Sequence, residues 1–71
     1  MFNKKLFREE IAARGLTIKE LSSAIGVNAA TMYRKMNEET EFTRKEIQEI
    51  CDALDIGAQK MQSIFFSENL A

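Results

Sequence analysis

The sequence predicts an all-α fold of five short helices. Apolar residues recur at the three- and four-residue spacing of a helix along most of the 71 residues, and helix-capping residues precede several of these runs. The chain has no proline, and its three glycines lie between the apolar runs, so the connections between helices are expected to be short. We therefore expect one domain over residues 1–71.

The first helix is expected at residues 3–14. Phe7 and Ile11 lie one helical turn apart, so both should face the core. Gly15 follows as the left-handed residue that commonly ends a helix. Leu16 is placed for the hydrophobic contact that accompanies this type of cap.

The next two helices are expected at residues 18–25 and 29–36. Thr17 and Glu20 form an S/T-x-x-E capping box, which satisfies backbone N–H groups at a helix start. Gly26 supplies the left-handed residue of the turn, and Asn28 is a strong N-cap for the helix expected at residues 29–36. Because only three residues separate the two runs, the helices must cross sharply, as they do in a helix-turn-helix.

The last two helices follow a second capping box. Thr43 and Glu46 form this box, so the fourth helix should begin after Thr43, and Gly57 is expected to end it. A fifth helix is expected at residues 59–67, with Met61, Ile64 and Phe65 on one side. The inward stripe of the fourth helix consists of Ile47, Ile50, Cys51 and Leu54.

Composition excludes several classes of function. The chain has no histidine and one cysteine, which removes a disulfide framework, the usual zinc sites and histidine-based triads. A carboxylate enzyme would need a paired acidic site, and no such pair stands out. Neither a leader sequence nor a membrane span is expected. We therefore expect a cytoplasmic protein that is not an enzyme, uses no cofactor, and binds neither a membrane nor a small-molecule substrate.

The helix at residues 29–36 has one face that is suited to a partner. Met32 and Met36 share the inner face, and Arg34 projects from the other side with Lys35 beside it. Arginine can bind guanine through two hydrogen bonds, or it can bind a phosphate. The alternative interpretation is an ordinary solvated helix face. The outward set is Ala29, Ala30, Tyr33, Arg34 and Asn37.

Residues 17–37, TIKELSSAIGVNAATMYRKMN, resemble the helix-turn-helix of the Cro/lambda-repressor (XRE-type) family, which usually reads T-Q-x-x-L-A-x-x-x-G-V-S-x-x-T-I-x-R. Residues 42–56 and 64–66 resemble the closing helices of its short prophage-encoded members. The resemblance implies a five-helix, lambda-repressor-like domain that binds double-stranded operator DNA, usually as a dimer. It implies that the residues facing the groove are Asn28, Ala29, Ala30, Tyr33, Arg34 and Asn37. Further DNA-binding candidates are Thr17, Lys19, Arg44 and Lys45.

Two departures from the family pattern affect this interpretation. Ile18 stands where the family often has a glutamine that helps to hold a phosphate. The loop at residues 38–41 reads Glu-Glu-Thr-Glu where the family often has glycine and lysine, and its carboxylates would repel a DNA backbone. The net charge of −1 is also unusual for a DNA-binding protein, although the distribution of charge matters more than the sum.

These observations predict a small phage-repressor-like transcriptional regulator whose residues 28–37 occupy the major groove. The alternative is a protein-interaction module on the same scaffold, such as an antirepressor or a regulatory subunit.

Adjacent aromatic residues on a helix point about 100° apart, so both members of a pair cannot face one core. We therefore expect a weak homodimer whose interface is drawn from Phe65, Phe66 and Leu70.

Overall fold

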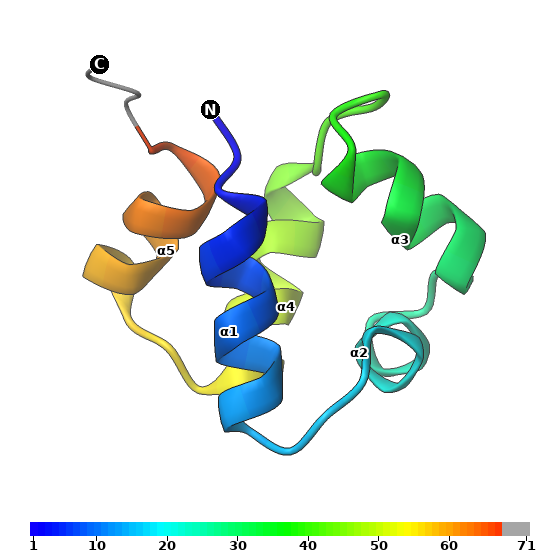
Figure 1. Cartoon of the computed structure of the whole chain (residues 1–71), viewed down its shortest axis with the longest axis horizontal. Helices are drawn as coiled ribbons and strands as arrows, with labels where there is room; N and C mark the ends of the chain where they lie inside the picture. Colours follow the sequence, from blue (N-terminus) through cyan, green and yellow to red (C-terminus); the bar gives the residue numbers. More distant parts are fainter. Residues whose placement is uncertain (68–71) are drawn as a thin grey trace.

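The computed structural model of the chain, which describes residues 1–67, contains five α-helices (Figure 1). This confirms the all-α prediction. The helices are α1 (Lys4–Ala13), α2 (Ile18–Ala24), α3 (Ala29–Met36), α4 (Arg44–Leu54) and α5 (Ala58–Phe65).

The central helix is α1, with α5 on one side, α2 on the other and α4 behind it (Figure 1). The third helix lies at one end of the molecule and packs chiefly on α2. Buried side chains from all five helices meet in one core. The core residues with essentially no exposed surface include Phe7, Leu21, Met32, Ile50, Leu54 and Ile64.

Four of the five helices begin with a side-chain cap. In α2 and α4 both hydrogen bonds of the predicted capping boxes are present. The side chain of Asn3 accepts a hydrogen bond from the backbone N–H of Leu6, and that of Asn28 accepts one from Thr31. These bonds satisfy donors that a helix start otherwise leaves without a partner. The helix starts predicted from the sequence therefore lie within one or two residues of the observed ones.

Helix ends follow the predictions at two of three glycines. Gly15 (φ 71°) and Gly26 (φ 78°) have the left-handed conformation expected after α1 and α2. The prediction for Gly57 is wrong, because α4 already ends at Leu54 and Asp55 (φ 53°) is the left-handed residue. The short polar side chain of aspartate tolerates this conformation better than most. Gly57 instead precedes α5 as its N-cap residue.

A group of four aromatic side chains closes the core where the N-terminal segment meets α1, α5 and the loop before α4. The rings of Phe2, Phe7, Phe42 and Phe65 lie with centroids 5.1 to 6.0 Å apart. Edge-on and tilted contacts between aromatic rings stabilise a core beyond the area that they bury.

Helices α1 and α5 are also joined by an ion pair of 2.6 Å between Glu10 of α1 and Lys60 of α5.

Candidate nucleic-acid interface

The turn between α2 and α3 fixes the direction in which α3 leaves the core. The backbone N–H of Val27 donates to the carbonyl oxygen of Ser22 at 3.0 Å, across the left-handed Gly26. Ser22 is buried, and its hydroxyl donates to the carbonyl oxygen of Ile18 at 2.7 Å. The small serine therefore lets α3 pass close to α2. Its own polar atom is satisfied within α2.

The two faces of α3 differ sharply in exposure. Met32 and Met36 on the inner face are 0% and 1% exposed. Tyr33 on the outer face is 42% exposed, and Arg34 beside it is also exposed. Ala30 is exposed and Ala29 is half-buried. This side of α3 has small side chains at its start and hydrogen-bonding side chains near its end, and it is open to a partner.

The asparagines at the two ends of α3, Asn28 and Asn37, each accept a hydrogen bond from another residue of the domain. Asn28 accepts the capping hydrogen bond at 2.7 Å, which leaves its amide nitrogen available to a ligand. At the other end, the ammonium of Lys4 donates to Oδ1 of Asn37 at 2.6 Å. Both asparagines are exposed. The contact between Lys4 and Asn37 links α1 to α3 and has no signal in the local sequence pattern.

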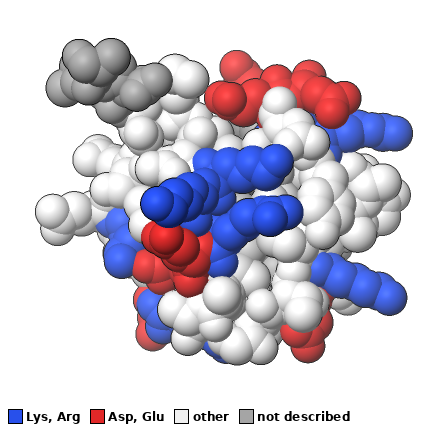
Figure 2. Space-filling model, viewed as in Figure 1, with Lys and Arg blue, Asp and Glu red and all other residues white. Residues whose placement is uncertain are grey.

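The remaining DNA-binding candidates lie at helix starts. Thr17 precedes α2 and Lys19 is in its first turn, while Arg44 and Lys45 are the first two residues of α4. All four are exposed. Thr17 is engaged in its capping box, because its N–H donates to Glu20 and its hydroxyl accepts from the same residue. Figure 2 shows basic side chains projecting at the edge of the molecule formed by α2 and α3.

The family model of the Cro/C1-type helix-turn-helix DNA-binding domain matches residues 7–59. The chain belongs to this family. The match extends from α1 to the start of α5 and contains the whole of α2, α3 and α4. Comparison with curated proteins and with solved structures gave no match. As a Cro/C1-type domain, the protein is a DNA-binding regulator in general terms. Domains of this family are typically not enzymes.

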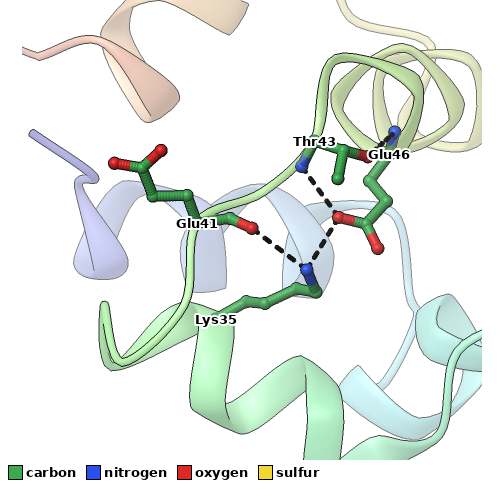
Figure 3. A network of polar contacts seen from close by, with 4 residues as sticks. All are labelled: Lys35, Glu41, Thr43 and Glu46. Carbon is green, nitrogen blue, oxygen red and sulfur yellow. Dashed lines mark hydrogen bonds and ion pairs between the residues drawn. The ribbon is translucent and has the colours of Figure 1, made fainter.

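One basic residue of this Cro/C1-type domain is held within the fold. The sequence placed Lys35 beside Arg34 as a second positive charge on α3. Its side chain is only 10% exposed, and its ammonium lies 2.9 Å from Oε1 of Glu46 and 3.0 Å from the carbonyl oxygen of Glu41 (Figure 3). Sequence reasoning missed this ion pair because the partners are 11 positions apart on different helices.

The position of Ile18 explains one departure from the family pattern. Its side chain is half-buried and packs against the core. An apolar side chain has no group that could donate to a phosphate oxygen. This residue therefore strengthens the packing of α2, and any phosphate contact at this end of α2 must come from a neighbouring residue.

The acidic loop at residues 38–41 closes α3. Glu38 adopts the left-handed conformation (φ 61°), and the N–H of Glu39 donates to the carbonyl oxygen of Arg34 at 2.9 Å. Glu38, Glu39 and Glu41 are exposed, and acidic side chains gather at the edge of the molecule next to this loop (Figure 2). The loop between α3 and α4 is therefore negative, while exposed cationic side chains lie on either side of it at Arg34 of α3 and at Arg44 and Lys45 of α4.

The aromatic residues at the end of α5 have opposite environments. Phe65 is 7% exposed and belongs to the core, so the expectation that it forms a subunit interface is wrong: its ring is covered by Phe2 and Phe42. Phe66 is 58% exposed. Leu70 lies outside the described residues. The burial of Phe65 and the exposure of Phe66 confirm the prediction that these two adjacent rings do not face the same core.

The remaining features of residues 1–67 concern metal-binding groups, the cysteine and membrane-spanning helices. Residues 1–67 bring together no group of three or more metal-ligating side chains. Burial raises the pKa of the Cys51 thiol, and the neighbouring charge of Asp52 raises it further, so this cysteine stays protonated at neutral pH. No helix among the described residues has the length and apolar character needed to span a membrane.

Proposed function

We propose that this Cro/C1-type domain is a sequence-specific regulator of the small phage-repressor or Cro-like type, with α3 as its recognition helix. The observation that carries the proposal is the asymmetry of α3, which buries two methionines and leaves Tyr33 and Arg34 exposed. A helix enters the major groove with one face, so it needs an inner face that is anchored and an outer face that is free. Occupancy of an operator by α3 would block or recruit RNA polymerase without any chemical step.

The residues have separate roles in this proposal. Arg34 reads a guanine, Tyr33 contacts sugar and phosphate, and the small side chains of Ala29 and Ala30 let the backbone approach the bases closely. Asn28 and Asn37 flank this face and can donate from their amide nitrogens. The phosphate contacts on either side come from Thr17, Lys19, Arg44 and Lys45.

We also propose that two copies pair on DNA. One domain of this size reads only a few base pairs, and two recognition helices one DNA turn apart would read more. Phe66 supports this idea because it is an exposed aromatic residue. The hollow on one side of it is lined by uncharged residues: Asn3, Leu6, Gln59, Gln62, Ser63 and Ser67. An interface of few side chains is expected to be weak in the absence of DNA.

The second candidate function is a protein-interaction module, and the acidic loop favours it. Within residues 1–67, no lysine or arginine forms an ion pair with Glu38, Glu39 or Glu41. Carboxylates without cationic partners suit a basic protein surface better than they suit phosphates. Replacement of Glu38, Glu39 and Glu41 by glutamine distinguishes the two functions, because loss of these carboxylates should strengthen binding to DNA and weaken binding to a basic protein.

The test is a selection of bound sites from random double-stranded DNA, followed by titration of Arg34→Ala and Lys45→Ala on the best site. We expect the wild-type protein to enrich one motif. We expect Arg34→Ala to cost about 1–3 kcal/mol on that motif and to relax preference at one base position. Lys45→Ala is the control that loses the same charge, and it should weaken binding to all sequences equally. Enrichment of no motif would contradict the proposed function.

A further inference from the structure

Lys35 has the most enclosed cationic group near the proposed recognition face. Its ammonium contacts two acceptors, Oε1 of Glu46 at 2.9 Å and the carbonyl oxygen of Glu41 at 3.0 Å. It also lies 5.9 Å from the centre of the Phe42 ring. The positive charge is therefore neutralised and its donors are largely engaged within the fold. For Lys35 to reach a phosphate, both bonds would have to break, and the carboxylate of Glu46 would lose its cation.

The same carboxylate oxygen also organises the start of α4. Oε1 of Glu46 accepts a hydrogen bond of 2.8 Å from the N–H of Thr43, and the Thr43 hydroxyl accepts one of 3.1 Å from the N–H of Glu46 (Figure 3). One oxygen thus completes the capping box of α4 and binds a side chain from α3. The carboxylate of Glu41 points away from Lys35, so only the backbone of the loop takes part (Figure 3).

The contact between Lys35 and Glu46 joins α3 to α4, two helices that pack on each other only slightly. The third helix packs chiefly on α2 through its inner face, and α4 packs on α2 and α5. The connection between the last turn of α3 and the first turn of α4 is the network of Lys35, Glu41, Thr43 and Glu46. Arg34 precedes Lys35 on α3, and Arg44 begins α4. The members of the network are therefore neighbours along the chain of the proposed base-reading residue and of the proposed phosphate contacts.

We infer that Lys35 is a positioning residue for DNA recognition, which holds the end of α3 at a fixed angle to the first turn of α4. This inference rests on the proposed function. Reading a base requires Arg34 to be placed accurately while Arg44 and Lys45 are engaged with the backbone. Attraction to phosphates depends much less on geometry. Loss of the tie should therefore lower affinity for the cognate site more than affinity for other sequences.

The experiment compares Lys35→Met with Lys45→Met, which removes the same charge from an exposed position on α4. Affinity is measured on the selected site and on unrelated DNA over a range of salt concentrations, at a temperature where circular dichroism shows both variants folded. We expect Lys35→Met to weaken the selected site about tenfold, the size of one misplaced base contact. Binding to unrelated DNA should change much less, because the Glu46 carboxylate left without its cation adds only a repulsion that salt screens.

The control should behave differently. Lys45→Met is expected to weaken binding to both DNAs alike and to reduce the slope of log affinity against log salt by about one. If Lys35→Met gives that same pattern, Lys35 is a phosphate contact and the inference is wrong. If Lys35→Met lowers only thermal stability and keeps the preference for the selected site, Lys35 has a structural role alone and the inference is also wrong.

Two further variants test the ion pair between Lys35 and Glu46 directly. Glu46→Gln keeps a side-chain oxygen for the N–H of Thr43 and for Lys35, so the cap is retained while the charge of the ion pair is lost. It should reduce preference for the selected site in the same direction as Lys35→Met but by less, and the double variant should be no worse than Lys35→Met. Lys35→Arg retains the charge and should restore most of the preference. Full additivity of the two single changes would contradict a shared role.

A measurement without DNA separates this inference from the proposed function. Residual dipolar couplings of backbone amides report the angle between α3 and α4 in the free protein. We expect Lys35→Met to change this angle or to broaden the α3 signals, and Lys45→Met to leave both unchanged. An unchanged angle together with unbroadened α3 signals in Lys35→Met overturns the inference even if the wild type reads DNA. If the wild type enriches no DNA motif, the proposed function fails first and the role in recognition fails with it.

Discussion

The ammonium of Lys4 donates a hydrogen bond of 2.6 Å to Oδ1 of Asn37 and thereby joins the start of α1 to the end of α3. The bond uses the acceptor of the asparagine and leaves its two amide donors free. In the proposed complex Asn37 can therefore donate to DNA while it stays fixed by Lys4. The residue is exposed, so a partner can approach it.

Replacement of Asn37 by aspartate tests this division of roles. Asn37→Asp keeps an oxygen for Lys4, and pairing with the Lys4 ammonium offsets the repulsion of the added charge by the negative end of the α3 dipole, so folding should be preserved. DNA affinity should fall by about tenfold or more, because the donors are lost and a carboxylate faces the phosphates. Urea unfolding and DNA titration measure the two effects. Unchanged DNA affinity would exclude Asn37 from the interface, and a large loss of stability would mean that its donors have a structural role.

The left-handed conformation of Glu38 should limit the stability of the α3–α4 turn. A residue other than glycine at a positive φ is strained, and glycine adopts this conformation freely. We expect Glu38→Gly to be more stable than Glu39→Gly by about 1 kcal/mol in chemical denaturation, since each removes one exposed carboxylate but only Glu38 has a positive φ. Equal stabilities of the two variants would show that the turn carries no strain at Glu38.

The ion pair between Lys35 and Glu46 should make stability depend on pH in the acid range. Burial raises the pKa of Glu46, but hydrogen bonds from Thr43 and the charge of Lys35 outweigh this effect and hold the pKa below its ordinary value of 4.5. The carboxylate is therefore favoured in the folded state. Its contribution should be complete above about pH 4.5 and should be lost as the pH falls through the folded-state pKa.

Thermal unfolding between pH 3 and pH 7 checks the dependence on Glu46. The wild type should lose more stability than Glu46→Gln as the pH falls, so the two curves should converge at low pH. Glu49→Gln, a change in the same helix away from Lys35, is the control and should follow the wild type. Parallel curves for wild type and Glu46→Gln would show that the ion pair does not contribute to stability.

Phe66 should affect pairing on DNA and leave the fold intact. It is 58% exposed, so Phe66→Asp should preserve helix content and affinity for a single half-site. Cooperative binding to a site with two half-sites should fall. Phe65→Asp is the contrasting change and should unfold the domain, because it buries a charge among Phe2, Phe7 and Phe42. Monomers on saturated two-half-site DNA in sedimentation would contradict the dimer.

Local interactions account for the features that the sequence predicted correctly. Each capping box joins residues only three positions apart, so Thr17 with Glu20 and Thr43 with Glu46 could be recognised without knowledge of the fold. The inner face of α3 followed from helical periodicity alone. Gly57 was a wrong prediction, since a rule that favours glycine at helix ends overlooked a left-handed aspartate two residues earlier.

The helices, their starts, the helix-turn-helix and the separation of α3 into a buried and an exposed face all follow from the order of residues along the chain. Caps and periodicity act over three or four residues and are visible in any short window of sequence. The packing of the helices is what pairs Lys35 with Glu46, brings Lys4 to Asn37, and buries Phe65 while it leaves Phe66 exposed. Those outcomes depend on how helices distant in sequence pack, because a charge or a ring takes its role from the neighbours that packing brings to it.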